Sequence, residues 1–181
     1  MSTSRNKTLT QEVCCKTRGV LQTIRLGAQI AYALKPGDVV ALTGELGAGK
    51  TYLIKGIAKG LSIPERQVTS PTYKFLNRYS GKFILNHIDA YRLSCSADAS
   101  DTVGDEIADK KAVTVIEWAD RISDFIPQNA LQVKIEIVGV RTRKFIFTGG
   151  SHLRRIREIV KQFSRAIYGA RIPPQWRSHF R

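Results

Sequence analysis

Gly44 opens the stretch GELGAGKT, which matches the phosphate-loop pattern G-x-x-x-x-G-K-[ST]. Gly44, Gly47 and Gly49 allow backbone conformations that turn successive N–H groups inward, toward an anion. The helix expected to begin near Gly49 adds its positive end to the same place. In such a loop Lys50 reaches the β- and γ-phosphates, and the Thr51 hydroxyl binds magnesium. The pattern therefore predicts binding of a nucleotide with Mg²⁺.

Two carboxylates end apolar runs further along the chain: Asp89 in NHIDAYRL and Glu117 in VIEWAD. Ligand sites of open parallel sheets lie at the carboxyl ends of strands, and phosphoryl chemistry needs an acid there to order magnesium or its waters. We expect one of these acids to serve the metal and both to face it. The alternative is that each is a solvated strand-end acid or a partner of Arg92 or Arg121.

Three further residues near these acids have two readings each. Thr72, in the loop VTSPTYKF, is a candidate switch residue that senses the γ-phosphate and magnesium, or part of a turn into an edge strand. His87 lies two residues before Asp89, on the same strand face, and is interpreted as a packed, hydrogen-bonded residue rather than a catalyst. Trp118 either stacks on a partner or fills the core.

Hydrophobic periodicity predicts the elements that must position these residues. Buried strands are expected over residues 38–44, 82–91 and 112–119, and a hairpin over 131–138 and 143–149 that turns around Gly139. Amphipathic helices are expected over 18–34, after the glycine loop, and over 151–169, with Ser151 as N-cap and Gly169 as the stop.

This order of elements predicts a single α/β domain over residues 1–169. We expect a phosphate-loop NTPase-like sheet, parallel in the centre with an antiparallel pair at one edge, and helices on both faces. Residues 170–181 are expected to form a flexible, basic C-terminal tail.

The charge of the chain is strongly positive. Twenty-nine Lys and Arg against fifteen Asp and Glu give +14, and residues 151–181 alone supply +7. In the last helix an apolar stripe leaves Arg154, Arg155, Arg157 and Lys161 largely outward. This segment is either solvated charge or a contact for an anionic partner, such as RNA.

The sequence predicts a cytoplasmic protein without a membrane segment. No apolar stretch is long enough to span a bilayer, and the N-terminus lacks a secretory apolar core. Cys14, Cys15 and Cys95 lack a CxxC spacing and are interpreted as structural thiols.

Four stretches in order closely resemble the TsaE family, the small bacterial ATPases that serve threonylcarbamoyladenosine synthesis on tRNA. They are GDVVALTGELGAGKT, VTSPTY, HIDAYRL and VIEWADRI, and the resemblance runs from about Thr17 to about Lys144. The glycine loop is common to many NTPases, whereas SPTY, H-x-D-x-Y-R-L and I-E-W in this order make the resemblance specific.

The resemblance implies an ATP-binding subunit that acts with two paralogous sugar-kinase-like proteins, one of which transfers the threonylcarbamoyl group. Hydrolysis of ATP resets or activates that pair and does not itself modify tRNA. The segment from Lys16 to Val20 is expected to border the adenine. The implied phosphate-binding residues are Gly44, Leu46, Gly47, Ala48, Gly49, Lys50 and Thr51. The implied catalytic residues are Lys50, Thr72, Asp89 and Glu117, with Thr51 and Glu117 as the magnesium ligands.

The chain departs from the family pattern in two places. After YRL, the stretch SCSADASDTVGDEI keeps only Gly104, Asp105 and Glu106 of a longer acidic helix, and the segment from about Arg154 onward is more basic than the family norm. Two other functions stay open: a small-molecule or nucleotide kinase, and an RNA-binding NTPase. Against the kinase, the sequence has no arginine-rich lid and no evident acceptor pocket. Since no arginine finger is placed by sequence, hydrolysis by the isolated chain is expected to be slow.

Overall fold

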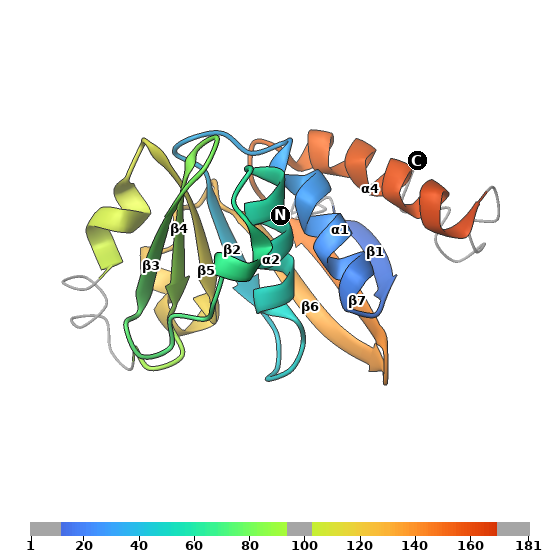
Figure 1. Cartoon of the computed structure of the whole chain (residues 1–181), viewed down its shortest axis with the longest axis horizontal. Coiled ribbons are helices and arrows are strands. Elements are labelled where there is room, and N and C mark those ends of the chain that lie inside the picture. The colour runs from blue at the N-terminus through green and yellow to red at the C-terminus, as the bar shows by residue number, and fades with distance from the viewer. Residues whose placement is uncertain (1–11, 94–102, 170–181) are drawn as a thin grey trace, which may run out of the picture.

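Seven strands form one mixed sheet in the computed structural model, which describes residues 12–93 and 103–169. Their order across the sheet is β1-β7-β6-β2-β5-β4-β3 (Figure 1). The strands are β1 (Val13–Arg18), β2 (Val39–Thr43), β3 (Leu76–Ser80), β4 (Ile84–Asp89), β5 (Ala112–Glu117), β6 (Leu131–Gly139) and β7 (Thr142–Thr148). The predicted tail of residues 170–181 lies outside the described residues, as does part of the stretch that departs from the family pattern.

The centre of the sheet is parallel and its edges are antiparallel. Strands β6, β2, β5 and β4 pair in parallel, while β7 and β1 on one side and β3 on the other pair antiparallel with their neighbours. The predicted parallel centre and the β6–β7 hairpin are confirmed. The hairpin does not form the edge, however, because β1 pairs with β7 outside it, and a second antiparallel pair closes the opposite edge.

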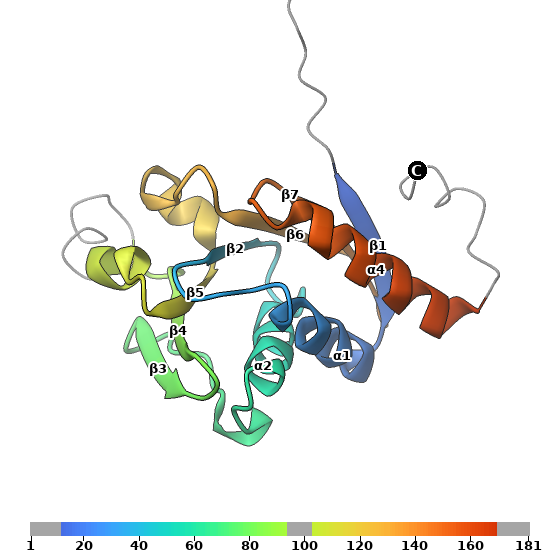
Figure 2. The ribbon, with the colours of Figure 1, turned by 90° about the horizontal axis from the view of Figure 1, so that it is seen from above.

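Helices cover both faces of the sheet, as predicted, and the alternation of side chains along β2 shows how. Val40 and Leu42 join a cluster with the buried faces of α1 (Val20–Ala31), α2 (Lys50–Gly60) and α4 (Leu153–Tyr168). Val39 and Ala41 point the other way, into a cluster with helical residues 103–108 and with η2 (Ala119–Phe125). Helices α1 and α2 lie side by side on the first face (Figure 2).

Close contact between α1 and α2 fixes the helix that starts at the glycine loop. A Cβ atom on Gly27 would lie 2.3 Å from the carbonyl oxygen of Leu53, and one on Gly56 would lie 2.2 Å from that of Ile24. Both distances are far below contact, so the two backbones meet only because these residues are glycines. The position of α2, and with it the N-terminus at the glycine loop, is thereby set by α1.

The last helix differs from the prediction at its start. It begins at Leu153, with His152 rather than Ser151 at the N-cap position and without a side-chain cap. The reason is a hydrogen bond of 2.8 Å between His152 Nε2 and Asp38 Oδ1, which holds this end of the helix to the loop before β2. The predicted stop at Gly169 is confirmed, with a φ of 62°. No helix in the described ranges is apolar and long enough to cross a membrane.

Candidate nucleotide-binding site

The glycine loop connects the end of β2 to the start of α2, at the carboxyl edge of the parallel strands. Gly44 leaves the strand with a φ of 144°, and a Cβ atom there would lie 2.5 Å from the carbonyl oxygen of Ile135 on β6. Gly47 and Gly49 also have positive φ angles, of 78° and 101°. The sequence thus lets the chain turn sharply against the neighbouring strand and enter the helix, whose first N–H groups have no acceptor within the helix itself.

Lys50 is held inside this loop. Its Nζ donates to the carbonyl oxygens of Gly44 (2.7 Å) and Glu45 (3.0 Å), and it lies 3.5 Å from the centre of the Trp118 ring. Burial lowers the pKa of Lys50, although the nearby carboxylates of Glu117 and Asp89 act in the opposite direction. An ammonium group with only neutral acceptors in direct contact is well placed to move to a phosphate oxygen.

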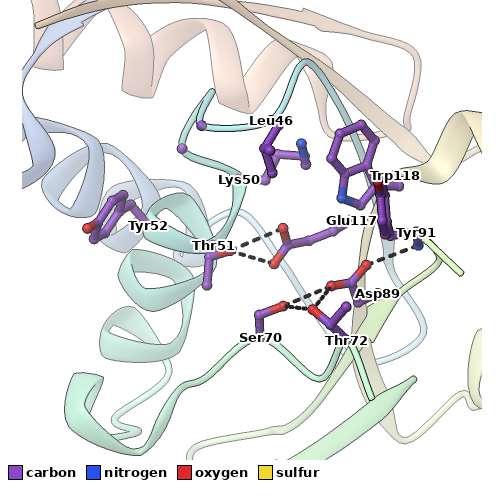
Figure 3. A pocket seen from close by; sticks show the side chains of 12 residues that line it. Leu46, Lys50, Thr51, Tyr52, Ser70, Thr72, Asp89, Tyr91, Glu117 and Trp118 are labelled. Atoms are coloured by element: carbon purple, nitrogen blue, oxygen red, sulfur yellow. Dashed lines mark hydrogen bonds between the residues drawn. The ribbon is translucent and has the colours of Figure 1, made fainter. Parts of the chain in front are cut away.

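Thr51 and Glu117 meet although they are 66 residues apart in the sequence. The Thr51 hydroxyl donates to both carboxylate oxygens of Glu117, at 2.9 and 3.1 Å. Glu117 ends β5, which lies beside β2 in the sheet, and it is only 3% exposed. The first turn of α2 and the end of the neighbouring strand therefore present a hydroxyl and a carboxylate to the same point (Figure 3).

Asp89 stands beside Glu117, since the two are register partners at the ends of β4 and β5. Its Oδ2 accepts hydrogen bonds from the hydroxyls of Ser70 and Thr72, both at 2.8 Å, and its Oδ1 accepts one from the Tyr91 N–H at 3.0 Å. The loop that contains Thr72 is thus attached to the site through Asp89 (Figure 3). It also leads into the edge strand β3, so the two readings of this loop are compatible.

These side chains line one pocket with a volume of about 370 Å³ (Figure 3). Its lining residues are Leu46, Gly47, Gly49, Lys50, Thr51, Tyr52, Ser70, Thr72, Asp89, Tyr91, Glu117 and Trp118. All four predicted catalytic residues are in this set. Of the predicted phosphate-binding residues, Gly44 lies outside the lining and accepts from Lys50, and Ala48 is fully buried.

Trp118 faces the pocket, which the sequence left undecided. It has a left-handed backbone conformation, with a φ of 57°, and its ring lies against Lys50 and 5.0 Å from the ring of Tyr91. The arginines considered as partners of the acids are placed elsewhere: Arg92 lies over the Tyr73 ring and Arg121 over the Tyr91 ring.

A second pocket, of about 380 Å³, lies on the other side of the glycine loop. It is lined by Arg18, Gly19, Val20, Leu21, Thr23, Gly47, Ala48, Gly49, Tyr52, Val140, Arg141 and Arg143. Gly47, Gly49 and Tyr52 border both pockets, so the two are neighbours at the loop.

Arg143 is a candidate functional residue that sequence reasoning missed. From β7 its Nη2 donates to the carbonyl oxygen of Gly47 at 3.2 Å, across 96 residues of sequence. Its Nη1 donates to the carbonyl oxygens of Gly139, Val140 and Thr142 at the hairpin turn. Arg143 therefore ties the glycine loop to the hairpin. The sequence does not show that the hairpin lies against the glycine loop, and without that contact Arg143 could not be predicted as a site residue.

The oxygen atoms at the end of β5 suit magnesium. Within the described ranges there is no group of three or more His, Cys, Asp or Glu side chains that could hold a metal ion. Magnesium in phosphate-binding sites usually takes one or two protein oxygens and completes its shell with waters and phosphates. The Thr51 hydroxyl and the Glu117 carboxylate, in contact at 2.9 Å, match that demand.

The chain is similar to proteins that carry one name. A family model described as threonylcarbamoyl adenosine biosynthesis protein TsaE matches residues 17–145. A protein of Treponema pallidum named tRNA threonylcarbamoyladenosine biosynthesis protein TsaE is 36% identical over 130 residues, which are 72% of this chain and 96% of the relative. The protein of that name from Bacillus subtilis is 43% identical over 116 residues, 63% of this chain and 71% of the relative.

A solved structure agrees with these relatives. The crystal structure of Bacillus subtilis YdiB superimposes with a TM-score of 0.67 at 31% identity, covering 88% of this chain and 98% of that one. The matched region contains the glycine loop, the Thr72 loop and both strand-end acids. By sequence and by fold, the chain belongs to the TsaE family.

Proposed function

We propose that this chain is the ATP-binding and ATP-hydrolysing subunit in tRNA threonylcarbamoyladenosine modification, acting on a partner transferase pair rather than on tRNA directly. One observation carries the proposal: in a TsaE-family chain, the phosphate-loop hydroxyl of Thr51 lies 2.9 Å from the carboxylate of Glu117. A phosphate loop with an acid on the neighbouring strand is the arrangement that phosphate-loop NTPases use for Mg²⁺ and the β- and γ-phosphates.

In this proposal the phosphates of ATP lie along the N–H groups of residues 46–51, at the positive end of α2. Lys50 leaves the carbonyl oxygens of its own loop and donates to the phosphates. Thr51 and Glu117 would hold Mg²⁺, which would supply positive charge to offset the negative charge that develops during transfer. Asp89 orients the attacking water or the metal's own waters.

Thr72 is proposed as the switch residue. Its hydroxyl and that of Ser70 both donate to one oxygen of Asp89, so the loop is tied to the acid beside the metal ligand. A γ-phosphate arriving between Thr72 and Lys50 competes for the same hydroxyls. The loop would then report the presence of ATP to a partner bound at its exposed end, where Tyr73 is 80% exposed.

The second pocket is proposed to hold the adenosine. It shares Gly47, Gly49 and Tyr52 with the phosphate pocket, and Arg18, Gly19 and Val20 of the expected adenine-bordering segment line it. Val20, Leu21 and Val140 add apolar surface for a base. A nucleotide with its phosphates at Lys50 can thus place its base on the far side of the loop.

Several further assignments belong to the same proposal. The partners are two sugar-kinase-like subunits of the tRNA-modifying complex, and the protein works in the cytoplasm. Residues 1–169 act as one ATPase domain. The basic C-terminal segment contacts tRNA or a partner subunit.

The test combines binding with a cellular readout. Calorimetry should show ATP binding to the wild-type chain and its loss in Lys50→Ala, while circular dichroism shows both variants folded. In bacteria depleted of their own TsaE-family protein, the wild-type chain should restore threonylcarbamoyladenosine in tRNA and Lys50→Ala should not. Unchanged ATP binding by Lys50→Ala contradicts the site. Phosphorylation of a small-molecule acceptor by the chain alone would favour the kinase alternative.

A further inference from the structure

His87 lies directly beneath the proposed magnesium ligand. Its side chain is fully buried, and its Nε2 is 2.9 Å from Oε1 of Glu117. In the parallel pairing of β4 with β5, Asp89 is opposite Glu117, whereas His87 is opposite Val115. His87 therefore lies two residues further from the carboxyl ends of these strands than the two acids. The described residues that line the nucleotide pocket do not include it, so it acts on a nucleotide only through another residue.

The chemistry of the contact gives it a direction. An ionised carboxylate only accepts hydrogen bonds, so Nε2 carries the hydrogen and donates it to Glu117. The other ring nitrogen, Nδ1, is buried and has no hydrogen-bond partner within the described part of the chain. A buried polar atom without a partner lowers stability, and an apolar residue would fill the same space without that loss. Packing alone therefore does not account for a histidine here.

The contact of His87 with Glu117 matters because, among the described residues, Thr51 and His87 are the two side chains that hydrogen-bond this carboxylate. The Thr51 hydroxyl reaches both carboxylate oxygens, at 2.9 and 3.1 Å, but has a single hydrogen to donate. With Thr51 alone, the carboxylate could turn about its last bond. A second donor that comes from β4 and fixes Oε1 removes this freedom, while Oε2 stays 3.1 Å from the Thr51 hydroxyl. Donors behind a metal ligand orient it in the same way at many metal sites.

We propose that His87 is a positioning residue that fixes the Glu117 carboxylate for magnesium. The inference rests on the proposed function, because it takes Glu117 as the metal ligand. It predicts that loss of the Nε2 donor weakens metal binding in the nucleotide complex and leaves metal-free nucleotide binding intact. It also predicts that the position of the donor matters, rather than the presence of a polar side chain.

Two substitutions separate these roles. In His87→Gln the amide nitrogen is as many bonds from Cα as Nε2 and can reach Glu117, whereas in His87→Asn the amide nitrogen is one bond shorter. The full-length chain is titrated with Mn²⁺ in the presence of ADP, and free Mn²⁺ is counted by electron paramagnetic resonance. We expect Mn²⁺ affinity to fall about 10–100-fold in His87→Asn and less than about threefold in His87→Gln. ADP affinity in EDTA should stay unchanged in both variants.

The control is Thr114→Val, which removes another buried hydrogen bond from the same sheet. Thr114 Oγ1 donates to the carbonyl oxygen of Glu106 at 2.8 Å, on the face of β5 opposite to Glu117. This variant should bind Mn²⁺ like the wild type.

Equal losses in His87→Gln and His87→Asn, no loss in either, or the same loss in Thr114→Val would each overturn the positioning role. A wild-type chain that binds ADP but whose nucleotide complex takes up no Mn²⁺ would contradict the proposed function, and the role of His87 with it. If instead the wild type binds Mn²⁺ and the His87 variants bind it equally well, only the positioning role of His87 fails.

Discussion

The ammonium nitrogen of Lys50 lies 3.5 Å from the centre of the Trp118 ring, at the end of the strand that also presents Glu117. The same nitrogen donates to two carbonyl oxygens of its own loop. A phosphate that binds Lys50 has to replace at least part of this set of contacts. The indole therefore lies next to the group that changes partner when a nucleotide arrives.

Trp118 should consequently report nucleotide binding by its fluorescence. The chain has two tryptophans, so Trp176→Phe leaves Trp118 as the single emitter. We expect its emission to change saturably with ATP, because the cation over the ring moves and the pocket loses water. The midpoint should equal the Kd from calorimetry. Heat of binding without any change in emission would show that Lys50 keeps its place over Trp118.

Arg143→Ala should weaken ATP binding without unfolding the chain. Its hydrogen bond of 3.2 Å to Gly47 holds the glycine loop from β7, and it also lines the proposed adenosine pocket. We expect the Kd to rise about tenfold, since a hydrogen bond from a charged group contributes about 1.5 kcal/mol. Lys144→Ala is the matched control: it removes one positive charge from the same strand, where Lys144 pairs with Glu136. Equal effects of the two variants would indicate a general loss of charge.

The acids at the ends of β4 and β5 should be needed for hydrolysis to different extents. Asp89→Asn and Glu117→Gln keep the shape of each side chain and remove its charge. Magnesium-dependent hydrolysis should fall on the order of a hundredfold or more in both. Glu117→Gln should also make ATP binding less dependent on magnesium than Asp89→Asn does. The reason is that Thr51 contacts Glu117, whereas Asp89 contacts Thr72.

Asp109→Asn serves as control for these two variants, because Asp109 pairs with Arg78 away from the pocket. It should hydrolyse ATP like the wild type. If Asp89→Asn and Glu117→Gln do so as well, the two acids are ordinary strand ends.

The sequence predicted the site where chemistry and local periodicity agree. A buried strand, a glycine loop and an amphipathic helix are encoded in one stretch from Val39 to Gly60, and the structure has them as β2, residues 44–49 and α2. The strand-end positions of Asp89 and Glu117 followed from apolar runs that stop at an acid. Which strands are neighbours did not follow, and this decides that Thr51 meets Glu117.

The parts that escaped prediction depend on contacts between distant segments. Strand β1 has no clear local signal, and it forms because Val13–Arg18 pairs with β7, more than 120 residues later. The start of α4 was predicted one residue early because the bond of His152 to Asp38 depends on tertiary structure. The role of Arg143 at the loop is hidden for the same reason, since its partner Gly47 lies across the sheet.

The isolated chain should hydrolyse ATP slowly. Among the described residues that line the proposed phosphate pocket, Lys50 is the cation, whereas Arg18, Arg141 and Arg143 line the proposed adenosine pocket. A cation that reaches the transferred phosphate from a partner can raise the rate by about 10³–10⁵. Turnover should therefore rise when the two sugar-kinase-like subunits are added, measured as phosphate release under saturating ATP. A fast rate that is indifferent to those subunits would favour an independent enzyme.

The basic C-terminal segment gives the last prediction. On α4 the side chains of Ile156, Val160 and Phe163 are buried, while Arg154 and Arg155 are exposed, so the helix docks by one face and presents positive charge on another. The stretch from 170 to 181 adds three arginines to this charge. If tRNA held by the complex contacts these groups, each lost phosphate contact lowers the salt slope of binding by nearly one unit.

Truncation after Gly169 tests this directly, because it removes Arg171, Arg177 and Arg181 and leaves α4 whole. ATP binding should stay intact, since the pockets are built by residues 18–143. Affinity of the assembled complex for tRNA should fall at low salt, and the slope of log K against log salt should become shallower by up to about three units. A second variant that keeps the full length but replaces the three arginines by glutamine separates charge from chain length. If assembly and tRNA affinity are unchanged in both variants, the segment is solvated charge without a partner.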